Sequence, residues 1–183
     1  NIQFRKQHSI KLLKELIELP ISVEKFDRSY IYHVSRAKLP KVQTKEVKKS
    51  VKTILSKPNL YQLMKLIYNA GLFQVVLPST KKIIDQPQFD GYHPVDLHSI
   101  KTLKFSQTIE DSYIKSIFDD LTNEQKIIVR LVAFFHDIGK GRTDDHHIVG
   151  EKLFKSMMKS FDFSEELIKL GARLVRYHNM MSY

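Results

Sequence analysis

Residues 131–150 read LVAFFHDIGKGRTDDHHIVG, and the rest of the chain is best interpreted outward from them. The segment begins with an apolar run typical of a buried helix, reaches the adjacent His136 and Asp137, and is then broken at Gly139. A buried histidine or carboxylate is costly unless another group pairs with it. A bound cation would supply that partner, so the His-Asp doublet indicates a metal site.

Three further histidines can join this doublet. The proposed ligands are His98, His136, Asp137, His146 and His178. Each lies at the end or on the flank of an expected helix beside apolar neighbours, and helices packed side by side would bring such residues to one pocket. The doublet also follows a helix C-terminus, where the macrodipole favours a cation. Because the chain contains no cysteine, a metal must bind His, Asp or Glu, which suit Mn, Fe, Zn or Mg.

Each histidine also has a structural interpretation. His178, taken alone, would usually be a hydrogen-bonded core residue, and His146, which follows two aspartates, could lie at a solvated helix start. The structural interpretation is weakest for the doublet, because a charged pair directly follows an apolar run and a glycine ends the helix at once. The remaining histidines are assigned to surface or supporting positions: His8, His33, His93 and His147.

The spacing of apolar residues predicts an all-α chain. In the first part, helices are expected over residues 1–19, within 26–39, from an N-cap at Thr44 to before Pro58, and over 60–70 with Gly71 as the C′ residue that ends the helix. The apolar segment 72–78 has no partner strand and is interpreted as a buried turn or helix end.

From about residue 81 the sequence becomes richer in turns and then returns to helices. These are expected to begin near Asp96, after Asp111, after a Thr122–Gln125 capping box, after Asp144 or Asp145, and after Ser164. In the last of them, four residues are expected to face inward: Leu167, Leu170, Leu174 and Val175.

Composition limits the class of protein. The chain has 183 residues, of which 42% are hydrophobic, and a formal net charge of +10, which suits one domain, or one and a half, with a real core. No apolar run approaches the roughly 20 residues that span a bilayer, and no signal peptide is visible, so we expect a cytoplasmic protein with no membrane partner. Because the chain begins at Asn1, we expect it to be a piece of a longer protein. The lysines between residues 38 and 57 indicate a solvated helix face or a docking surface for an acidic partner.

The stretch around the doublet resembles the signature of the HD superfamily of metal-dependent phosphohydrolases. Within it, the segment from Gly71 to Tyr183 is most similar to the HD domain of the bifunctional PII uridylyltransferase/uridylyl-removing enzymes. The matching motifs are Gly71-Leu-Phe with Leu77-Pro78, Gln88-Phe-Asp-x-Tyr-His93, Val95-Asp-x-His98-Ser, Phe135-His-Asp-Ile-Gly-Lys-Gly-Arg142, Asp145-His-x-x-x-Gly150 and Leu174-Val-Arg-x-His178-x-x-Met-Ser182. Residues 1–70 resemble, more loosely, the helical region between the transferase and HD domains. The resemblance implies an HD-domain helical bundle at 81–183, preceded by a helical linker region at 1–80.

The same resemblance implies a ligand set for one or two divalent ions. On the matching positions, His98, His136 and Asp137 would hold the main metal, and Asp137 could bridge to a second. His146 and His178 would complete a second metal position or contact the phosphate.

The resemblance also implies a reaction, the removal of UMP from a uridylylated tyrosine of the PII nitrogen-regulatory protein. Lys140 would face the phosphate, with Arg142 as a further catalytic candidate. HD proteins contribute one more metal-ligand aspartate on a helix after the last histidine, and Tyr183 comes before that point. We therefore expect the HD domain to be truncated, which puts the activity of this piece in question. The motifs of a nucleotidyltransferase domain are absent from the sequence.

Two other classes of function stay open. An HD phosphodiesterase acting on RNA or on a cyclic nucleotide would fit the positive charge, although no RNA-binding motif such as GxxG in a KH-like context is present and a nucleic-acid partner is not expected. A non-catalytic helical domain that docks or regulates a partner would fit the missing aspartate.

Overall fold

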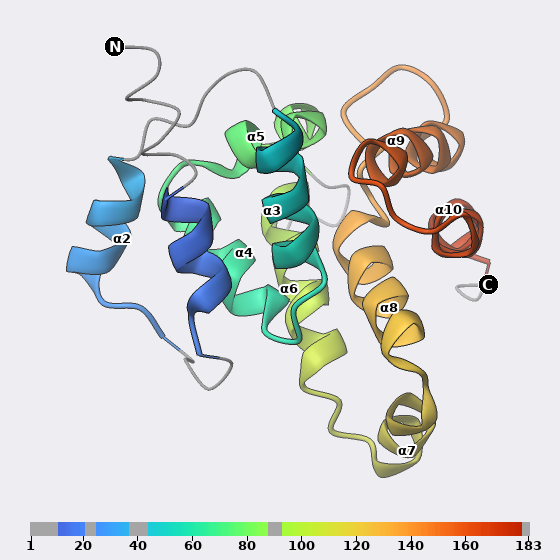
Figure 1. Ribbon diagram of the computed structural model, residues 1–183. Helices are drawn as coiled ribbons and strands as arrows, with labels where there is room; N and C mark the ends of the chain where they lie inside the picture. The colour runs from blue at the N-terminus through green and yellow to red at the C-terminus, as the bar shows by residue number, and fades with distance from the viewer. Residues whose placement is uncertain (1–10, 21–24, 37–43, 88–92, 181–183) are drawn as a thin grey trace. The chain divides into compact units, whose positions relative to one another are not determined.

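The computed structural model describes residues 11–20, 25–36, 44–87 and 93–180, whose regular secondary structure is helical with no strand (Figure 1). The all-α prediction is confirmed. The chain divides into two compact units, Asn1–Pro78 and Ser79–Tyr183, each with its own packing. None of the described helices is long and apolar enough to cross a membrane.

The first unit is organised around α4 (Leu60–Asn69), which packs against α2 (Arg28–Ser35), α3 (Lys45–Leu55) and the single turn α5 (Phe73–Val76). Residues 11–18 form a further helical segment, whose predicted beginning lies outside the described residues. Thr44 caps α3 as predicted, since its hydroxyl accepts a hydrogen bond of 3.3 Å from the Val47 N–H. The buried core of this unit includes Leu13, Leu16, Val51, Ile54, Leu63, Met64 and Ile67.

Helix α4 ends at a glycine in the left-handed region, as predicted. Gly71 has a φ of 72°, its N–H donates to the Tyr68 carbonyl at 2.9 Å, and the Leu72 N–H donates to the Ile67 carbonyl at 3.0 Å. This pair of bonds is a Schellman motif, which satisfies carbonyls that the helix itself leaves without partners. The chain then continues through α5 into the 3₁₀ helix η1 (Pro78–Lys82), so the apolar segment is a helical turn.

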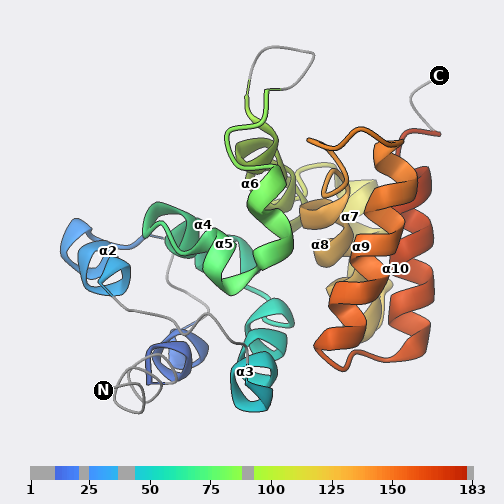
Figure 2. The same ribbon diagram turned by 90° about the horizontal axis from the view of Figure 1, so that it is seen from above.

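The second unit carries the histidines of interest. Its central helix α8 (Asn123–Phe135) packs against α6 (Val95–Gln107) and α10 (Glu165–Tyr177), and α10 pairs with α9 (His146–Ser160) (Figure 2). A shorter helix, α7 (Ser112–Asp120), contributes no buried residue. The core of the unit includes Leu103, Ile128, Leu131, Phe134, Phe135, Phe154 and Val175.

The predicted caps of this unit form. Thr122 and Gln125 make a complete capping box at the start of α8. Asp145, rather than Asp144, caps α9 by accepting from the His147 N–H at 2.8 Å. Ser164 caps α10, and its hydroxyl accepts from the backbone N–H three residues on.

The inward face predicted for α10 is half wrong. Leu167 and Val175 are buried, but Leu170 and Leu174 are 41% and 42% exposed. The helix packs through Gly171 instead, where an added Cβ would lie 2.6 Å from ring carbons of Phe154. The missing side chain lets the α9 ring approach the α10 backbone, and this turns the two leucines outward.

Candidate metal centre

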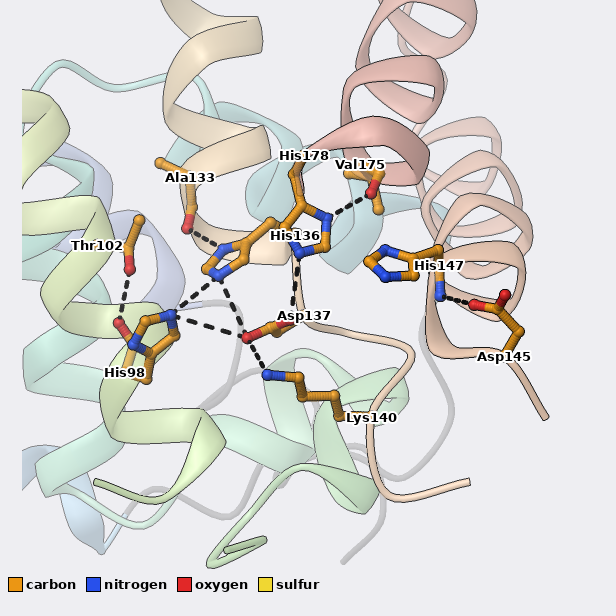
Figure 3. A network of polar contacts seen from close by, with 10 residues as sticks. All are labelled: His98, Thr102, Ala133, His136, Asp137, Lys140, Asp145, His147, Val175 and His178. Atoms are coloured by element: carbon orange, nitrogen blue, oxygen red, sulfur yellow. Dashed lines mark hydrogen bonds and ion pairs between the residues drawn. The ribbon is translucent and has the colours of Figure 1, made fainter. Parts of the chain in front are cut away.

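The carboxylate of Asp137 lies just beyond the end of α8, at the centre of a group of imidazole rings (Figure 3). The residue is 2% exposed. Its Oδ2 atom lies 2.8 Å from Nζ of Lys140, 3.3 Å from Nε2 of His136 and 3.7 Å from Nε2 of His98. Its Oδ1 atom lies 3.5 Å from Nε2 of His178. The two carboxylate oxygens therefore face two different groups of imidazole rings.

His98 of α6 and His136 at the end of α8 form, with Asp137, the first cluster. One donor atom from each of the three lies within 4.8 Å of the others, and the two Nε2 atoms are 3.0 Å apart. Nδ1 of His136 donates to the Ala133 carbonyl at 2.9 Å. Because that nitrogen holds the proton of the neutral ring, Nε2 carries the lone pair that could bind a metal.

His146 and His147 in the first turn of α9, with His178 at the end of α10, form the second cluster. Their donor atoms also lie within 4.8 Å of one another. Nδ1 of His178 donates to the Val175 carbonyl at 2.7 Å, so its Nε2 atom is directed at Asp137. Nε2 of His146 and Nδ1 of His147 are buried and have no hydrogen-bond partner within the described part of the chain.

This donor set fits a divalent cation. A neutral imidazole whose lone pair faces a carboxylate oxygen is repelled by it unless a proton or a metal ion lies between them. Buried polar atoms are normally hydrogen-bonded, and here two ring nitrogens and Oδ1 of Asp137 have no such bond to any described residue. Imidazole and carboxylate ligands without thiolate suit Mn, Fe, Zn or Mg, and metal binding would satisfy these atoms together.

The pKa values in the site depart from their ordinary values in opposite directions. Burial raises the pKa of Asp137, but the imidazoles of His136 and His178 and the ammonium of Lys140 beside it outweigh this effect and keep the pKa well below its usual range. Burial lowers the pKa of His178, but the neighbouring Asp137 carboxylate and the Val175 carbonyl outweigh this effect and leave the pKa raised. The pKa values of His146 and His147 are lowered, by burial first and then by neighbouring histidines.

Two glycines bring the start of α9 against the turn that carries Asp137. A Cβ added at Gly139 would lie 1.9 Å from the His146 carbonyl oxygen and 2.7 Å from the Gly150 nitrogen. One added at Gly150 would lie 3.2 Å from a methyl carbon of Val175 on α10. Backbone contact at this point is the reason that histidines of α9 and α10 reach the carboxylate at the end of α8.

The structure brings together the residues predicted as ligands, divided between the two clusters. His98, His136 and Asp137 lie in the first, and His146 and His178 in the second. His147 was placed outside the ligand set, and its donor atom nevertheless lies in the second cluster. Neighbouring residues on a helix usually point apart. At the first turn of α9, however, the rings of His146 and His147 lie 3.8 Å apart by their centroids. The sequence signal for His147 as a ligand was its position next to His146, directly after the capping residue Asp145.

The two basic residues predicted as catalytic differ in surroundings. The Lys140 side chain is 30% exposed and bonded to Asp137. The guanidinium of Arg142 instead donates to backbone carbonyls, those of Ile138 at 2.8 Å, Lys140 at 3.1 Å and Ser79 at 3.4 Å. Arg142 therefore holds the loop around Lys140 against the segment that precedes α6.

The other histidines lie away from the two clusters or outside the described residues. His33 pairs with Glu15 at 3.7 Å on the surface of the first unit. His93 accepts a hydrogen bond from the ammonium of Lys101 on α6. His8 lies outside the described residues.

Comparison with known proteins identifies the family to which the second unit is similar. Residues 95–183 match the family described as the HD domain. The chain is 35% identical over 135 residues to the bifunctional uridylyltransferase/uridylyl-removing enzyme of Vibrio parahaemolyticus, an alignment that covers 68% of this chain and 15% of that protein. It is 33% identical over 149 residues to the enzyme of the same name from Vibrio vulnificus, covering 75% and 17%. For that of Erythrobacter litoralis the identity is 35% over 120 residues, covering 62% and 13%. The alignments thus span only 13–17% of the length of these relatives. Residues 95–183 therefore belong to the HD-domain family.

Proposed function

We propose that the chain hydrolyses phosphodiesters with the help of a divalent metal, and that its substrate is the uridylylated PII nitrogen-regulatory protein, from which it removes UMP. One observation carries the proposal: a buried carboxylate has two oxygens that face separate imidazole clusters, with a lysine bonded to one of them. The choice of substrate rests on the similarity to uridylyl-removing enzymes.

The first cluster would hold the main metal. Its three donors come from two packed helices and the turn after α8, so they are fixed before any ligand binds. The second cluster would hold a second ion, with His147 added to His146 and His178, and Asp137 would bridge the two positions through its separate oxygens. A bound divalent ion lowers the pKa of water to about 7 and neutralises charge on the phosphoryl oxygens.

Lys140 would bind the phosphoryl group directly. Its ammonium has three donor hydrogens, and one of them is used on Asp137 at 2.8 Å. The others are available to a phosphoryl oxygen beside the first cluster, because 30% of the side chain is exposed. Arg142 would act indirectly, because its bonds to the Ile138 and Lys140 carbonyls fix the loop from which Lys140 extends. We assign it a positioning role.

The leaving group of the proposed reaction suits this set of residues. Release of UMP from a tyrosine expels a phenolate, whose conjugate acid has a pKa of about 10. Such a leaving group needs less protonation than an alkoxide would. A site that consists of metal ligands and one lysine, without a dedicated general acid, is therefore adequate for the reaction.

The test measures UMP released from uridylylated PII by the chain, with and without Mn²⁺. Asp137→Ala should abolish both metal-dependent release and Mn²⁺ binding measured by titration calorimetry. Asp144→Ala is the matched control, because it removes an exposed acid from the same segment and should change neither.

A second substrate separates the reaction class from the substrate assignment. Metal-dependent cleavage of bis(p-nitrophenyl) phosphate with inert uridylylated PII would keep the phosphodiesterase and overturn PII as the substrate, and RNA or a cyclic nucleotide would be tested next. If the chain binds Mn²⁺ but cleaves neither substrate, the catalytic proposal is wrong for this chain, and a docking or regulatory role is favoured.

A further inference from the structure

The face of α6 that carries His98 continues toward the end of the helix with an exposed aromatic ring. Residues three, four and seven positions apart share one face of a helix, so Lys101, Thr102 and Phe105 follow His98 in a row. Phe105 is 68% exposed. The buried residues of α6 lie on a different side: Val95, Asp96, Ser99, Ile100 and Leu103.

The residues of this row differ in what they can offer a ligand. The Thr102 hydroxyl donates to the His98 carbonyl at 3.0 Å, and the ammonium of Lys101 donates to His93. Among the described residues, the Phe105 ring makes no stacking, edge or cation contact. A phenylalanine this exposed gains little from folding, because the apolar area of its ring stays in water.

The position of the ring matches the length of a nucleotide. Seven residues of α-helix separate His98 from Phe105, a rise of about 10 Å. A nucleoside monophosphate held by its phosphate at the first cluster reaches a comparable distance with its base, across the ribose. Lys101 lies between the two ends of this row, beside the position that the ribose would take.

We propose that Phe105 is a stacking platform for the nucleobase of the substrate, so that this face of α6 binds a nucleoside monophosphoryl group along its length. The inference rests on the proposed function, because it takes the phosphate at the first cluster as the anchor. Stacking on an aromatic ring requires only the flat face of a base. The platform therefore selects substrates that carry a nucleobase over those that do not, whichever base is present.

The test compares UMP with ribose 5-phosphate, which has the same phosphate and sugar but no base. Binding of each to the Mn²⁺-loaded chain is measured by titration calorimetry. We expect UMP to bind about tenfold more tightly or better, an advantage of the size that base–aromatic stacking supplies. Phe105→Ala should remove this advantage and leave ribose 5-phosphate unchanged, whereas Phe105→Trp should retain it. Tyr32→Ala is the matched control, since it removes an aromatic ring that is 62% exposed in the first unit.

Two outcomes overturn the inference. One is equal binding of UMP and ribose 5-phosphate by the unaltered chain, and the other is a preference for UMP that survives Phe105→Ala. Neither depends on turnover, so failure of the proposed reaction is recognised separately. A chain that releases no UMP from any substrate, yet loses its preference for UMP on Phe105→Ala, would refute the reaction and retain the nucleobase site.

Discussion

Substituting Gly139 by alanine tests whether backbone contact between two helices assembles the candidate metal centre. The added Cβ would lie 1.9 Å from the His146 carbonyl oxygen and 2.8 Å from its carbon, whereas real Cβ contacts essentially never fall below 3.0 Å. Both opposing atoms are backbone atoms at the start of α9. They cannot turn aside as a flexible side chain would, so the first turn of α9 must move by about an ångström relative to Asp137.

The displacement should lower both the folding stability and the affinity for metal. Overpacking of this kind costs about 1–3 kcal/mol of folding stability, and the upper end is expected because the obstruction is backbone. For a chain of this size the melting temperature would fall by roughly 3–10 °C. Metal ligands tolerate errors of only about 0.2 Å, so binding at the second cluster, whose His146 and His147 lie at the displaced helix start, should weaken more than binding at the first.

Thermal unfolding followed by circular dichroism in EDTA gives the stability, and calorimetric titration with Mn²⁺ gives the binding. Gly71→Ala is the control of identical chemistry. Gly71 has a φ of 72°, so alanine there is strained by about 1–2 kcal/mol, but no atom lies within 4 Å of the new Cβ. It should lower stability and leave Mn²⁺ binding intact. A Gly139→Ala chain with unchanged melting temperature and Mn²⁺ affinity would refute the reasoning.

Three other perturbations have definite expected results. Gly171→Ala places a Cβ 2.6 Å from the Phe154 ring and should lower the urea unfolding free energy by about 1–3 kcal/mol, with Mn²⁺ affinity nearly unchanged because the clash lies away from the ligands. Arg142→Lys keeps the charge but loses the fork that spans three carbonyls, so kcat should fall about tenfold or more with KM and metal content little changed. His178 has a raised pKa, so its stabilisation of the metal-free chain is fully present below pH 6.5 and lost as pH rises through the folded pKa. The destabilisation caused by His178→Gln, measured by urea unfolding in EDTA, should therefore shrink as pH rises.

Each of these expectations has a result that would contradict it. Wild-type kcat in Arg142→Lys would mean that the loop around Lys140 needs no support from the guanidinium. A destabilisation by His178→Gln that is constant from pH 5.5 to 8.5 would show that His178 gains no charged interaction from Asp137. Full stability of Gly171→Ala would mean that the α9–α10 pair is packed loosely enough to absorb a methyl group.

Helix positions and caps were predictable because they depend on local chemistry. Thr44 and Ser164 each accept a hydrogen bond from a backbone N–H three residues on, and Thr122 and Gln125 make reciprocal bonds within one turn. The side chain and its partner are close in sequence, so the pattern carries the information. The orientation of α10 was not predictable in this way. Periodicity places Leu170 and Leu174 on the expected inward face. The face that packs is instead set by Gly171, which leaves room for the Phe154 ring.

The candidate site was predictable in its residues and not in its arrangement. The apolar run into His136 and Asp137 indicates a ligand pair, because little else justifies burying it. That Asp137 has one oxygen toward each cluster depends on how α8, α9 and α10 pack. The same holds for His147 and Arg142. His147 joins the second cluster because α9 starts at that point. Arg142 bonds to carbonyls that come together only in the folded loop.

The electrostatics of the two clusters suggest how such a site remains ready for a metal near neutral pH. Metal ligands must give up their protons, so every protonated imidazole raises the cost of binding. Burial lowers the pKa values of His146 and His147, so these rings are neutral and keep lone pairs. Asp137 is ionised because its pKa is held low, and His178 has its pKa raised by that carboxylate. Within the second cluster, His178 is therefore the ring on which a metal must compete most strongly with a proton. Since a divalent ion interacts more strongly with Asp137 than a single proton charge does, the carboxylate that holds the proton on His178 also favours its replacement by the metal.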